Sequence, residues 1–136
     1  MTFGWVKRET AAGHAIFIWW DSQPERLSPR LLALCADPDN TLVLSVASVW
    51  EMQIKVQLGK LDLDRPLTGI VEGHLLGNQI ELLPIELPHV LTLEQLPFHH
   101  KDPFDRLIVA QALAEHLTIL SVDSLLGQYP VTVYSR

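Results

Sequence analysis

Residues 102–123, DPFDRLIVAQALAEHLTILSVD, decide the fold that we expect for this chain. Asp102 is a favourable N-cap, the proline after it suits the first helical position, and Asp105 falls at the third. The apolar residues that follow cover a wide arc, which predicts a largely buried helix. Residues 117–122 form a short, unbroken apolar run, typical of a parallel strand covered on both faces. Asp123 then lies at the carboxyl end of that strand, where open α/β sheets bind ligands.

The composition predicts one folded domain, residues 1–136, with a substantial core. Hydrophobic residues make up 48% of the chain and charged residues 19%, which is not typical of disordered chains. The apolar run at residues 14–20 is far shorter than the ~18 residues of a membrane span, and no signal peptide is recognisable. The single cysteine, Cys35, fits a reducing compartment, and we expect it to be a small buried apolar residue. A cytoplasmic protein that does not bind membranes is therefore expected.

The net charge of −6 argues against broad, sequence-independent coating of nucleic acid, which requires a basic face. It is compatible with an enzyme that meets phosphate groups through bound metal ions. Clustered acidic residues are what such a site requires.

Apolar runs and helix signals alternate along the rest of the chain. Buried strands are predicted at residues 41–46, 80–85 and 131–134, and no strand is predicted in the first dozen residues. Helices are predicted from Ser28 to Ala36, from Ser48 to Gly59, over 88–96, and within 61–79, where Gly73 and Gly77 break the helix. This alternation predicts an α/β fold with a parallel sheet and helices on both faces.

Three acidic residues, far apart in sequence, fall at equivalent places in this fold. Glu51 is predicted in the first turn of a helix, in the capping-box pattern Ser48-x-x-Glu51, and Asp105 in the first turn of another. Asp123 ends a strand. In a parallel sheet the carboxyl ends of the strands and the starts of the following helices lie on one side. We therefore expect the three carboxylates to converge.

Helix capping is the simpler explanation for each acid alone, because first-turn acids contribute ~0.3–1 kcal/mol to helix stability. Three acids at one edge favour a different interpretation, since like charges brought together repel unless a cation lies between them. Ligands that offer only oxygen suit Mg²⁺ or Mn²⁺ and not Zn²⁺. The pattern thus favours a divalent metal site.

Other residues near the predicted edge have ordinary explanations. Lys55 is four residues after Glu51, which predicts a helical ion pair. Arg106 has two interpretations, a contact to phosphate or a plain surface role. Adjacent histidines at 99 and 100 are expected on a solvated loop, since no zinc-ligand spacing accompanies them. Core positions are expected for the tryptophans at 19, 20 and 50.

Several of these segments together resemble the PIN domain family, and more narrowly the VapC-type toxins of bacterial type II toxin–antitoxin pairs. They are Ser45-x-x-Ser48-x-Trp50-Glu51, then Lys55 and Gly59-Lys60-Leu61, then His100-x-Asp102-Pro103-Phe104-Asp105-Arg106 with Gln111-Ala112, then Ser121-Val122-Asp123. The resemblance extends from about His14 to Tyr134.

The resemblance implies a three-layer α/β/α fold and an Mg²⁺- or Mn²⁺-dependent ribonuclease. It also implies a homodimer, inhibited by a cognate antitoxin whose C-terminal segment wraps the toxin. Glu51, Asp105 and Asp123 would then be the acidic metal ligands and catalytic residues, with Ser121 beside them to orient a ligand or water. Asp102 and Arg106 would lie behind the metal ligands and support them, or would contact the substrate.

The start of the chain departs from the family pattern. Family members begin with an apolar strand that ends Asp-Thr-His, and its aspartate is a principal metal ligand. Here His14 matches the histidine, so the aspartate position falls on Ala12, and the threonine position falls on Gly13. Glu9 is the nearest acid and is three residues out of register. Residues 1–13 are therefore atypical for the family.

Three functions are compatible with the sequence. The first is a metal-dependent endoribonuclease that cleaves RNA phosphodiesters with activated water. The second is a PIN-fold protein with little or no catalysis that binds an antitoxin, because Ala12 offers no carboxylate. The third is a phosphoacceptor, receiver-like domain, which ranks last because no lysine follows a late strand in the required context.

Overall fold

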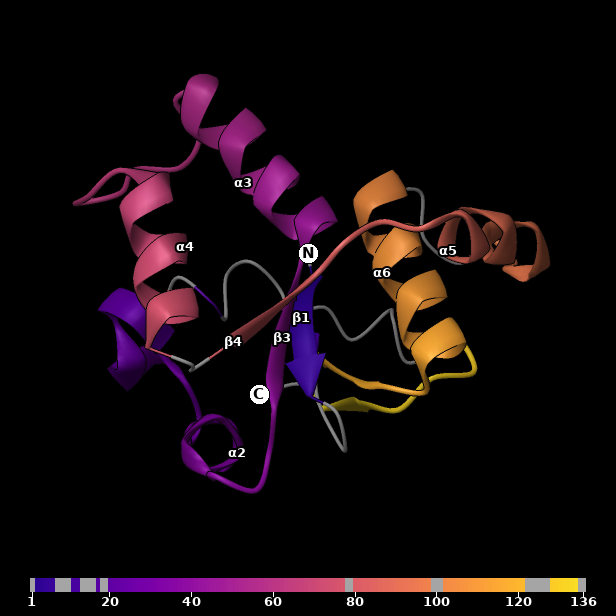
Figure 1. The fold of residues 1–136 in the computed structure, drawn as a ribbon, viewed down its shortest axis with the longest axis horizontal. Coiled ribbons are helices and arrows are strands. Elements are labelled where there is room, and N and C mark those ends of the chain that lie inside the picture. Colours follow the sequence, from indigo (N-terminus) through magenta and orange to yellow (C-terminus); the bar gives the residue numbers. More distant parts are fainter. Residues whose placement is uncertain are drawn as a thin grey trace.

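A mixed sheet runs through the centre of the computed structural model, which describes residues 2–6, 11–12, 17, 20–77, 80–98, 102–121 and 128–134 (Figure 1). Within these residues the strand order is β4-β3-β1-β2-β5-β6. The strands are β1 (Thr2–Val6), β2 (Ala11–Ala12), β3 (Leu42–Ser45), β4 (Ile80–Leu83), β5 (Thr118–Ser121) and β6 (Val133–Tyr134). β3 and β4 are parallel to each other, as are β2, β5 and β6, which agrees with the expected parallel pairing.

The sequence predicted neither β1 nor β2, and β1 is the longer of these two strands. It is antiparallel to both β3 and β5, with Trp5 opposite Val43 and opposite Ile119, and Thr2 opposite Ser121. Four of the five residues in the segment TFGWV favour strands, but the segment shows neither clean alternation nor an unbroken apolar run, so its pattern does not specify a strand. Hydrogen-bonding edges on both sides supply the pairing that local sequence does not specify.

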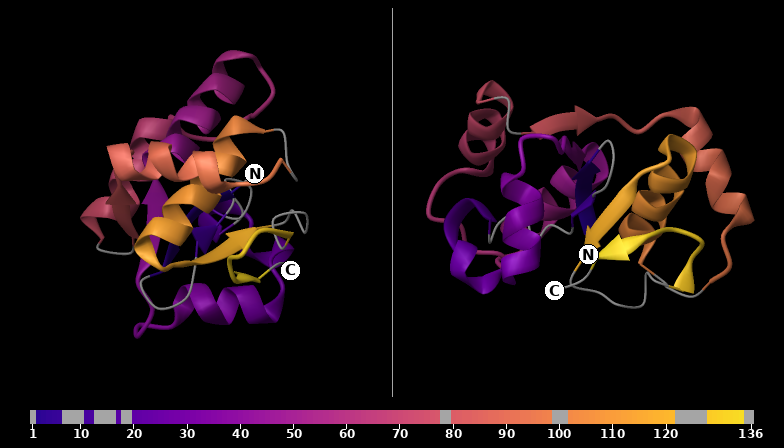
Figure 2. Two further views of the ribbon diagram at one scale, coloured as in Figure 1. Left: turned by 90° about the vertical axis from the view of Figure 1, so that its right-hand side faces the viewer. Right: turned by 90° about the horizontal axis from the view of Figure 1, so that it is seen from below.

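Helices cover both faces of the sheet, so the predicted three-layer α/β/α fold is confirmed (Figure 2). Side chains alternate along the strands: Leu42 and Leu44 enter one core, while Val43 enters the other. The helices are α2 (Pro29–Ala36), α3 (Val46–Gln57), α4 (Leu67–Leu76), α5 (Leu87–Thr92) and α6 (Pro103–Glu115), with 3₁₀ turns η1 (Pro24–Arg26) and η2 (Leu93–Gln95). None of the helices in the described ranges combines the length and the apolar content of a bilayer span.

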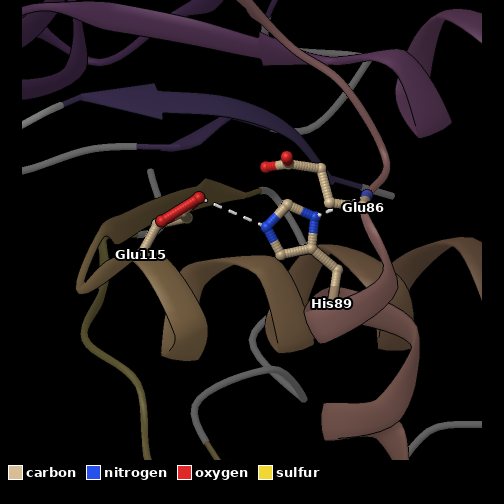
Figure 3. A group of neighbouring side chains, drawn as sticks. All are labelled: Glu86, His89 and Glu115. Carbon is tan, nitrogen blue, oxygen red and sulfur yellow. Dashed lines mark hydrogen bonds and ion pairs between the residues drawn. The ribbon is translucent and has the colours of Figure 1, made fainter.

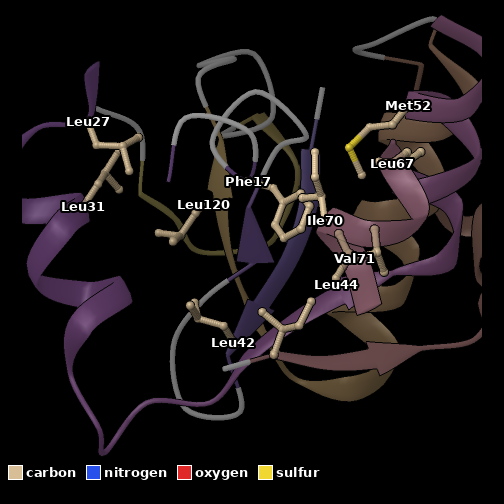
Figure 4. Packing of buried hydrophobic residues seen from close by; sticks show 11 residues of the cluster. Phe17, Leu27, Leu31, Leu42, Leu44, Met52, Leu67, Ile70, Val71 and Leu120 are labelled. Carbon is tan, nitrogen blue, oxygen red and sulfur yellow. The ribbon is translucent and has the colours of Figure 1, made fainter. Parts of the chain in front are cut away.

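The first core lies between the sheet, α2 and α4 (Figure 4). Its centre is formed by fully buried side chains, among them Phe17, Leu31, Leu44 and Ile70. The second core lies between the opposite face and α6, whose run Ile108, Val109, Ala110 and Ala112 is buried throughout. The wide apolar arc that predicted a largely buried helix at this position is confirmed.

The start of α3 differs from the prediction. Ser45 ends β3 and at once caps α3, because its Oγ accepts a hydrogen bond of 3.1 Å from the backbone N–H of Ala47. The helix therefore begins at Val46, and Ser48 lies inside its first turn. The predicted capping box at Ser48 is wrong, and Glu51 belongs to the second turn. No loop separates strand from helix, which is why the later serine looked like the cap.

Most other helix ends agree with the sequence signals. Asp102 caps α6 as predicted, its Oδ1 accepting from the N–H groups of Phe104 (2.8 Å) and Asp105 (3.3 Å). Ser28 caps α2, and Gly59 follows α3 with a φ of 71°. The predicted break at Gly73 is wrong, since α4 continues through it to Leu76 and ends at Gly77.

Candidate functional site

Glu51 and Asp105 are buried acidic side chains from two helices that pack together. Glu51 in α3 is 3% exposed and Asp105 in α6 is 1% exposed. Burial raises the pKa of Asp105, and the carboxylates of Asp102 and Glu51 raise it further. The two predicted acids that the structure describes are thus near enough to interact electrostatically.

Helix capping does not explain Glu51, and the helix dipole explains only part of the setting of Asp105. Glu51 is in the second turn of α3, beyond the N–H groups that a first-turn acid can satisfy. Asp105 is in the first turn of α6, but the capping bonds there are made by Asp102. A buried carboxylate is costly unless a partner compensates its charge. This donor set, carboxylate oxygens held close together, fits a hard divalent cation.

Lys55 forms the ion pair that the sequence predicts. Its Nζ is 3.8 Å from Oε2 of Glu51, one turn along α3. The lysine side chain is only partly exposed, so its charge offsets part of the negative potential around Glu51.

Arg106 points toward the segment that follows η2. Its Nη2 donates a 2.9 Å hydrogen bond to the carbonyl oxygen of Leu96, and its guanidinium lies 4.0 Å from the centre of the Phe98 ring. Its Nε is buried and makes no hydrogen bond to any of the residues described. These contacts hold residues 96–98 against the start of α6.

Of the predicted site residues, Ser121 is described in part and Asp123 is not among the residues that the structure describes. Ser121 ends β5, and nothing beyond its backbone is described; Asp123 lies outside the described residues, as do His99, His100 and Lys101. Ala12 in β2 pairs in parallel with Leu120, one residue before Ser121. Because β1 is antiparallel to β3 and to β5, the carboxyl ends of β2, β3 and β5 all lie at one edge of the sheet.

Trp50 is not a core residue, so that prediction is wrong. It is 56% exposed, and its ring meets Phe104 in an edge-to-face contact with 5.0 Å between centroids. Of the other tryptophans, Trp20 packs against the first core and stacks on His74, while Trp19 lies outside the described residues. Trp50 therefore links the middle of α3 to the start of α6.

Cys35 is half-buried, and burial raises the pKa of its thiol to about 12. A thiol with such a pKa is almost fully protonated at neutral pH and is a poor nucleophile. This agrees with the packing role expected for Cys35.

A buried polar group on the second-core side was missed by the sequence analysis. Ser45, His89 and Gln111 are all at most 1% exposed. The Oγ of Ser45 donates to Oε1 of Gln111 at 2.5 Å, and Nε2 of Gln111 donates to the carbonyl oxygen of Pro84 at 3.2 Å. A glutamine within an apolar helical run was the feature of the sequence that could have indicated this group, because a buried amide requires hydrogen-bond partners.

Glu86, His89 and Glu115 bring their possible ligand atoms within 4.8 Å of one another (Figure 3). The backbone N–H of Glu86 donates to Nδ1 of His89 at 3.1 Å, so Nδ1 carries no proton. The proton is then on Nε2, which faces Oε1 of Glu115 at 3.3 Å. Both ring nitrogens are engaged, and the group is a hydrogen-bond network rather than a set of open metal ligands.

Comparisons with known proteins agree with this architecture. The PIN domain family matches residues 15–130 of the chain. No curated protein gives a match. A solved structure of VapBC2 from Rickettsia felis, bound to a DNA fragment from their promoter, superimposes with a TM-score of 0.67 at 16% identity, covering 93% of this chain and 96% of that one. The structural likeness supports the fold, and the family match covers most of the sequence: the chain belongs to the PIN domain family.

Proposed function

We propose that this protein is a VapC-type toxin, an Mg²⁺- or Mn²⁺-dependent endoribonuclease. The observation that carries the proposal is the pair of buried carboxylates, Glu51 and Asp105, which interact although they come from different helices. Asp123 and Ser121 complete the proposed site, as the family motif implies. PIN domains are in general divalent-metal-dependent nucleases, and the solved VapBC2 structure makes an antitoxin the expected protein partner.

In the proposed mechanism the protein supplies oxygen ligands from two buried side chains, one on α3 and one on α6. Glu51 and Asp105 would hold the cation, and Lys55 offsets part of the negative charge of Glu51. A bound Mg²⁺ or Mn²⁺ would supply activated water for in-line attack on an RNA phosphodiester and would stabilise the leaving oxygen. The products would carry 5′-phosphate and 3′-hydroxyl ends, as in the family. Asp102 keeps the first turn of α6 in place, which fixes the backbone that carries Asp105.

The experiment is cleavage of RNA by purified protein in Mn²⁺, comparing the wild type with Asp105→Asn. The substitution keeps the shape of the side chain and removes its charge, so we expect cleavage to fall at least ~100-fold, as for an essential ligand. Asp64→Asn is the matched control, since Asp64 is an exposed acid in the loop before α4 and should leave the rate unchanged. Equal cleavage by wild type and Asp105→Asn would overturn the assignment.

A second function is favoured by one specific observation, the alanine at position 12. In parallel register with Leu120, this position lies at the edge of the sheet where the family places an aspartate. A protein that lacks one of four acidic ligands would bind metal weakly and would act chiefly by binding an antitoxin. The substitution Ala12→Asp distinguishes the two functions.

We further propose that the protein forms a homodimer through α5. Leu87, Val90 and Leu91 follow one another at helical spacing and are all exposed, so they form one apolar stripe on this short helix. A second copy could bury the same stripe about a two-fold axis.

A further inference from the structure

A chain of buried hydrogen bonds connects the start of α3 with α6 and with α5. Ser45 Oγ donates to Gln111 Oε1, and Gln111 Nε2 lies 3.3 Å from His89 Nδ1. The imidazole in turn reaches Glu115 at the surface. Sixty-six residues separate Ser45 from Gln111, so this bond is a tertiary link and not a local cap.

The donors and acceptors along this chain fit only one way. The amide of Gln111 accepts from the hydroxyl of Ser45 through its oxygen and donates to the carbonyl oxygen of Pro84 through its nitrogen, which also lies 3.3 Å from Nδ1 of His89. A carboxylate at this position would have no hydrogen to donate, and an ammonium would have no lone pair to accept. Glutamine therefore supplies both the acceptor that Ser45 needs and the donor that Pro84 needs.

The same two helices meet again near the acidic pair. Trp50 contacts Phe104, while Glu51 and Asp105 are the next residues along their helices. Ser45 is six residues before Glu51, and Gln111 is six residues after Asp105. The start of α3 thus lies beside the middle of α6, and the start of α6 lies beside the middle of α3. The Ser45–Gln111 hydrogen bond and the Trp50–Phe104 contact together determine the position of α3 along α6.

We infer that Gln111 is a positioning residue for the acidic pair: through Ser45 it sets the register of α3 on α6, and hence the distance between Glu51 and Asp105. The metal-binding consequence rests on the proposed function, whereas the helix register does not. Aromatic rings at the surface can slide past each other, but a buried hydrogen bond has a narrow range of geometry. The hydrogen bond of Ser45 therefore restricts the position of α3 along α6 more narrowly than the Trp50–Phe104 contact does.

The test compares Mn²⁺ affinity by titration calorimetry for the wild type, Gln111→Met and Ser45→Ala. Loss of a residue that orients metal ligands typically weakens metal binding by about 10–100-fold, and we expect that range for both variants. Ser45→Thr keeps the hydroxyl and should retain the wild-type affinity. Ser28→Ala is the matched control, because it removes the N-cap serine of α2 away from the acids and should leave Mn²⁺ binding unchanged.

A crystal structure of metal-free Gln111→Met supplies the second readout. We expect α3 to be displaced along α6 by about 1 Å, a shift sufficient to spoil a ligand geometry. If Gln111→Met does not fold, the same two measurements on Ser45→Ala decide the inference.

The outcomes separate this inference from the proposed function. If Asp105→Asn abolishes Mn²⁺ binding while Gln111→Met and Ser45→Ala bind as tightly as the wild type, the site stands and the positioning role of Gln111 is overturned. If the wild type binds no Mn²⁺, the proposed function fails, and the displacement of α3 in the crystal structure is then the only test of the positioning role of Gln111. An unmoved α3 in the variant would then refute the inference, and a displaced α3 would support it.

Discussion

Glu51 and Asp105 show the tension between folding and function at single residues. Taking a carboxylate out of water disfavours its charged form, and the raised pKa of Asp105 reflects that cost. A protein under pressure for stability alone would place apolar side chains at these two positions. Two carboxylates buried at the contact between α3 and α6 are the kind of oxygen ligands that a hard divalent cation prefers, and this is the role that we propose for them.

Asp21 shows the opposite case, a carboxylate whose charge stabilises the fold. Burial raises its pKa, but hydrogen bonds from Ser22 (2.7 Å), His74 (2.8 Å) and Arg65 (2.6 Å) outweigh burial and hold the pKa below its usual range. An acid with a depressed folded-state pKa contributes stability above its unfolded pKa of roughly 3.9 and loses it as the pH falls through the folded value. The contact with His74 joins the helical residues 20–22 to α4.

We therefore predict that Asp21→Asn lowers the free energy of unfolding at pH 5 and above by about 1–2 kcal/mol. The lower end is expected, because Arg65 is half exposed and its interaction is screened by solvent. The deficit should shrink below pH 4 as the wild-type carboxylate becomes protonated. Thermal unfolding of both proteins between pH 5 and pH 2.5 measures this. A deficit that stays constant to pH 2.5 would show that side-chain shape, and not charge, is responsible.

At the scale of elements, two glycines on neighbouring helices should respond to alanine with opposite signs. Gly59 follows α3 with a φ of 71°, a left-handed conformation that costs a residue with a Cβ roughly 1 kcal/mol. Gly73 lies inside α4, and a methyl group there would meet nothing within 4 Å. We predict that Gly59→Ala destabilises the protein and that Gly73→Ala stabilises it by roughly 0.5–1 kcal/mol. Urea denaturation gives both values, and two changes of the same sign would contradict this account.

The elements that the sequence predicted are those with strong local signals. Asp102 with the following proline defined the start of α6, Ser28 defined α2, and unbroken apolar runs predicted β3 and β5. Predictions failed where tertiary contacts decide. β1 depends on ladders from β3 and β5, and the cap of α3 is Ser45 because the helix follows the strand directly.

The candidate site was predictable in part for the same reason. The sequence could predict that Glu51 and Asp105 lie on one side of the sheet, because the carboxyl ends of parallel strands and the starts of the following helices share that side. It could not give the pairing of Ser45 with Gln111, since contacts between distant helices depend on how two surfaces pack. The prediction that Trp50 is a core residue failed for the same reason. Its apolar neighbours in the sequence face the core, while its own ring packs against Phe104 and is exposed.

For the whole molecule, the exposed stripe on α5 predicts the oligomeric state. Leu91→Glu places a charge within the stripe, so a dimer held by the stripe should dissociate. Sedimentation equilibrium should give a dimer for the wild type and a monomer for the variant. Leu76→Glu is the control, because Leu76 is the most exposed of the large apolar residues described and lies at the end of α4, away from α5. A monomeric wild type, or a Leu91→Glu variant that stays dimeric, would contradict the proposed interface.

The edge of the sheet where β2, β3 and β5 end is also a property of the whole molecule, since it joins segments from the start, middle and end of the chain. Ala12 is in register with Leu120 at that edge, so Ala12→Asp adds a carboxylate at the position where the family carries one. We predict that it raises Mn²⁺ affinity at least ~10-fold and increases RNA cleavage.

Leu76→Glu is the control, because it adds a carboxylate at an exposed position at the end of α4; it should change neither Mn²⁺ binding nor cleavage. Calorimetry with Mn²⁺ and a cleavage assay on the three proteins measure the difference. A large gain specific to Ala12→Asp would mean that the present chain has a weakened nuclease site, and would favour antitoxin binding as its main activity. If Ala12→Asp increases neither Mn²⁺ affinity nor RNA cleavage over the wild type, the acids do not converge at this end of the sheet. The proposed nuclease function would then be wrong.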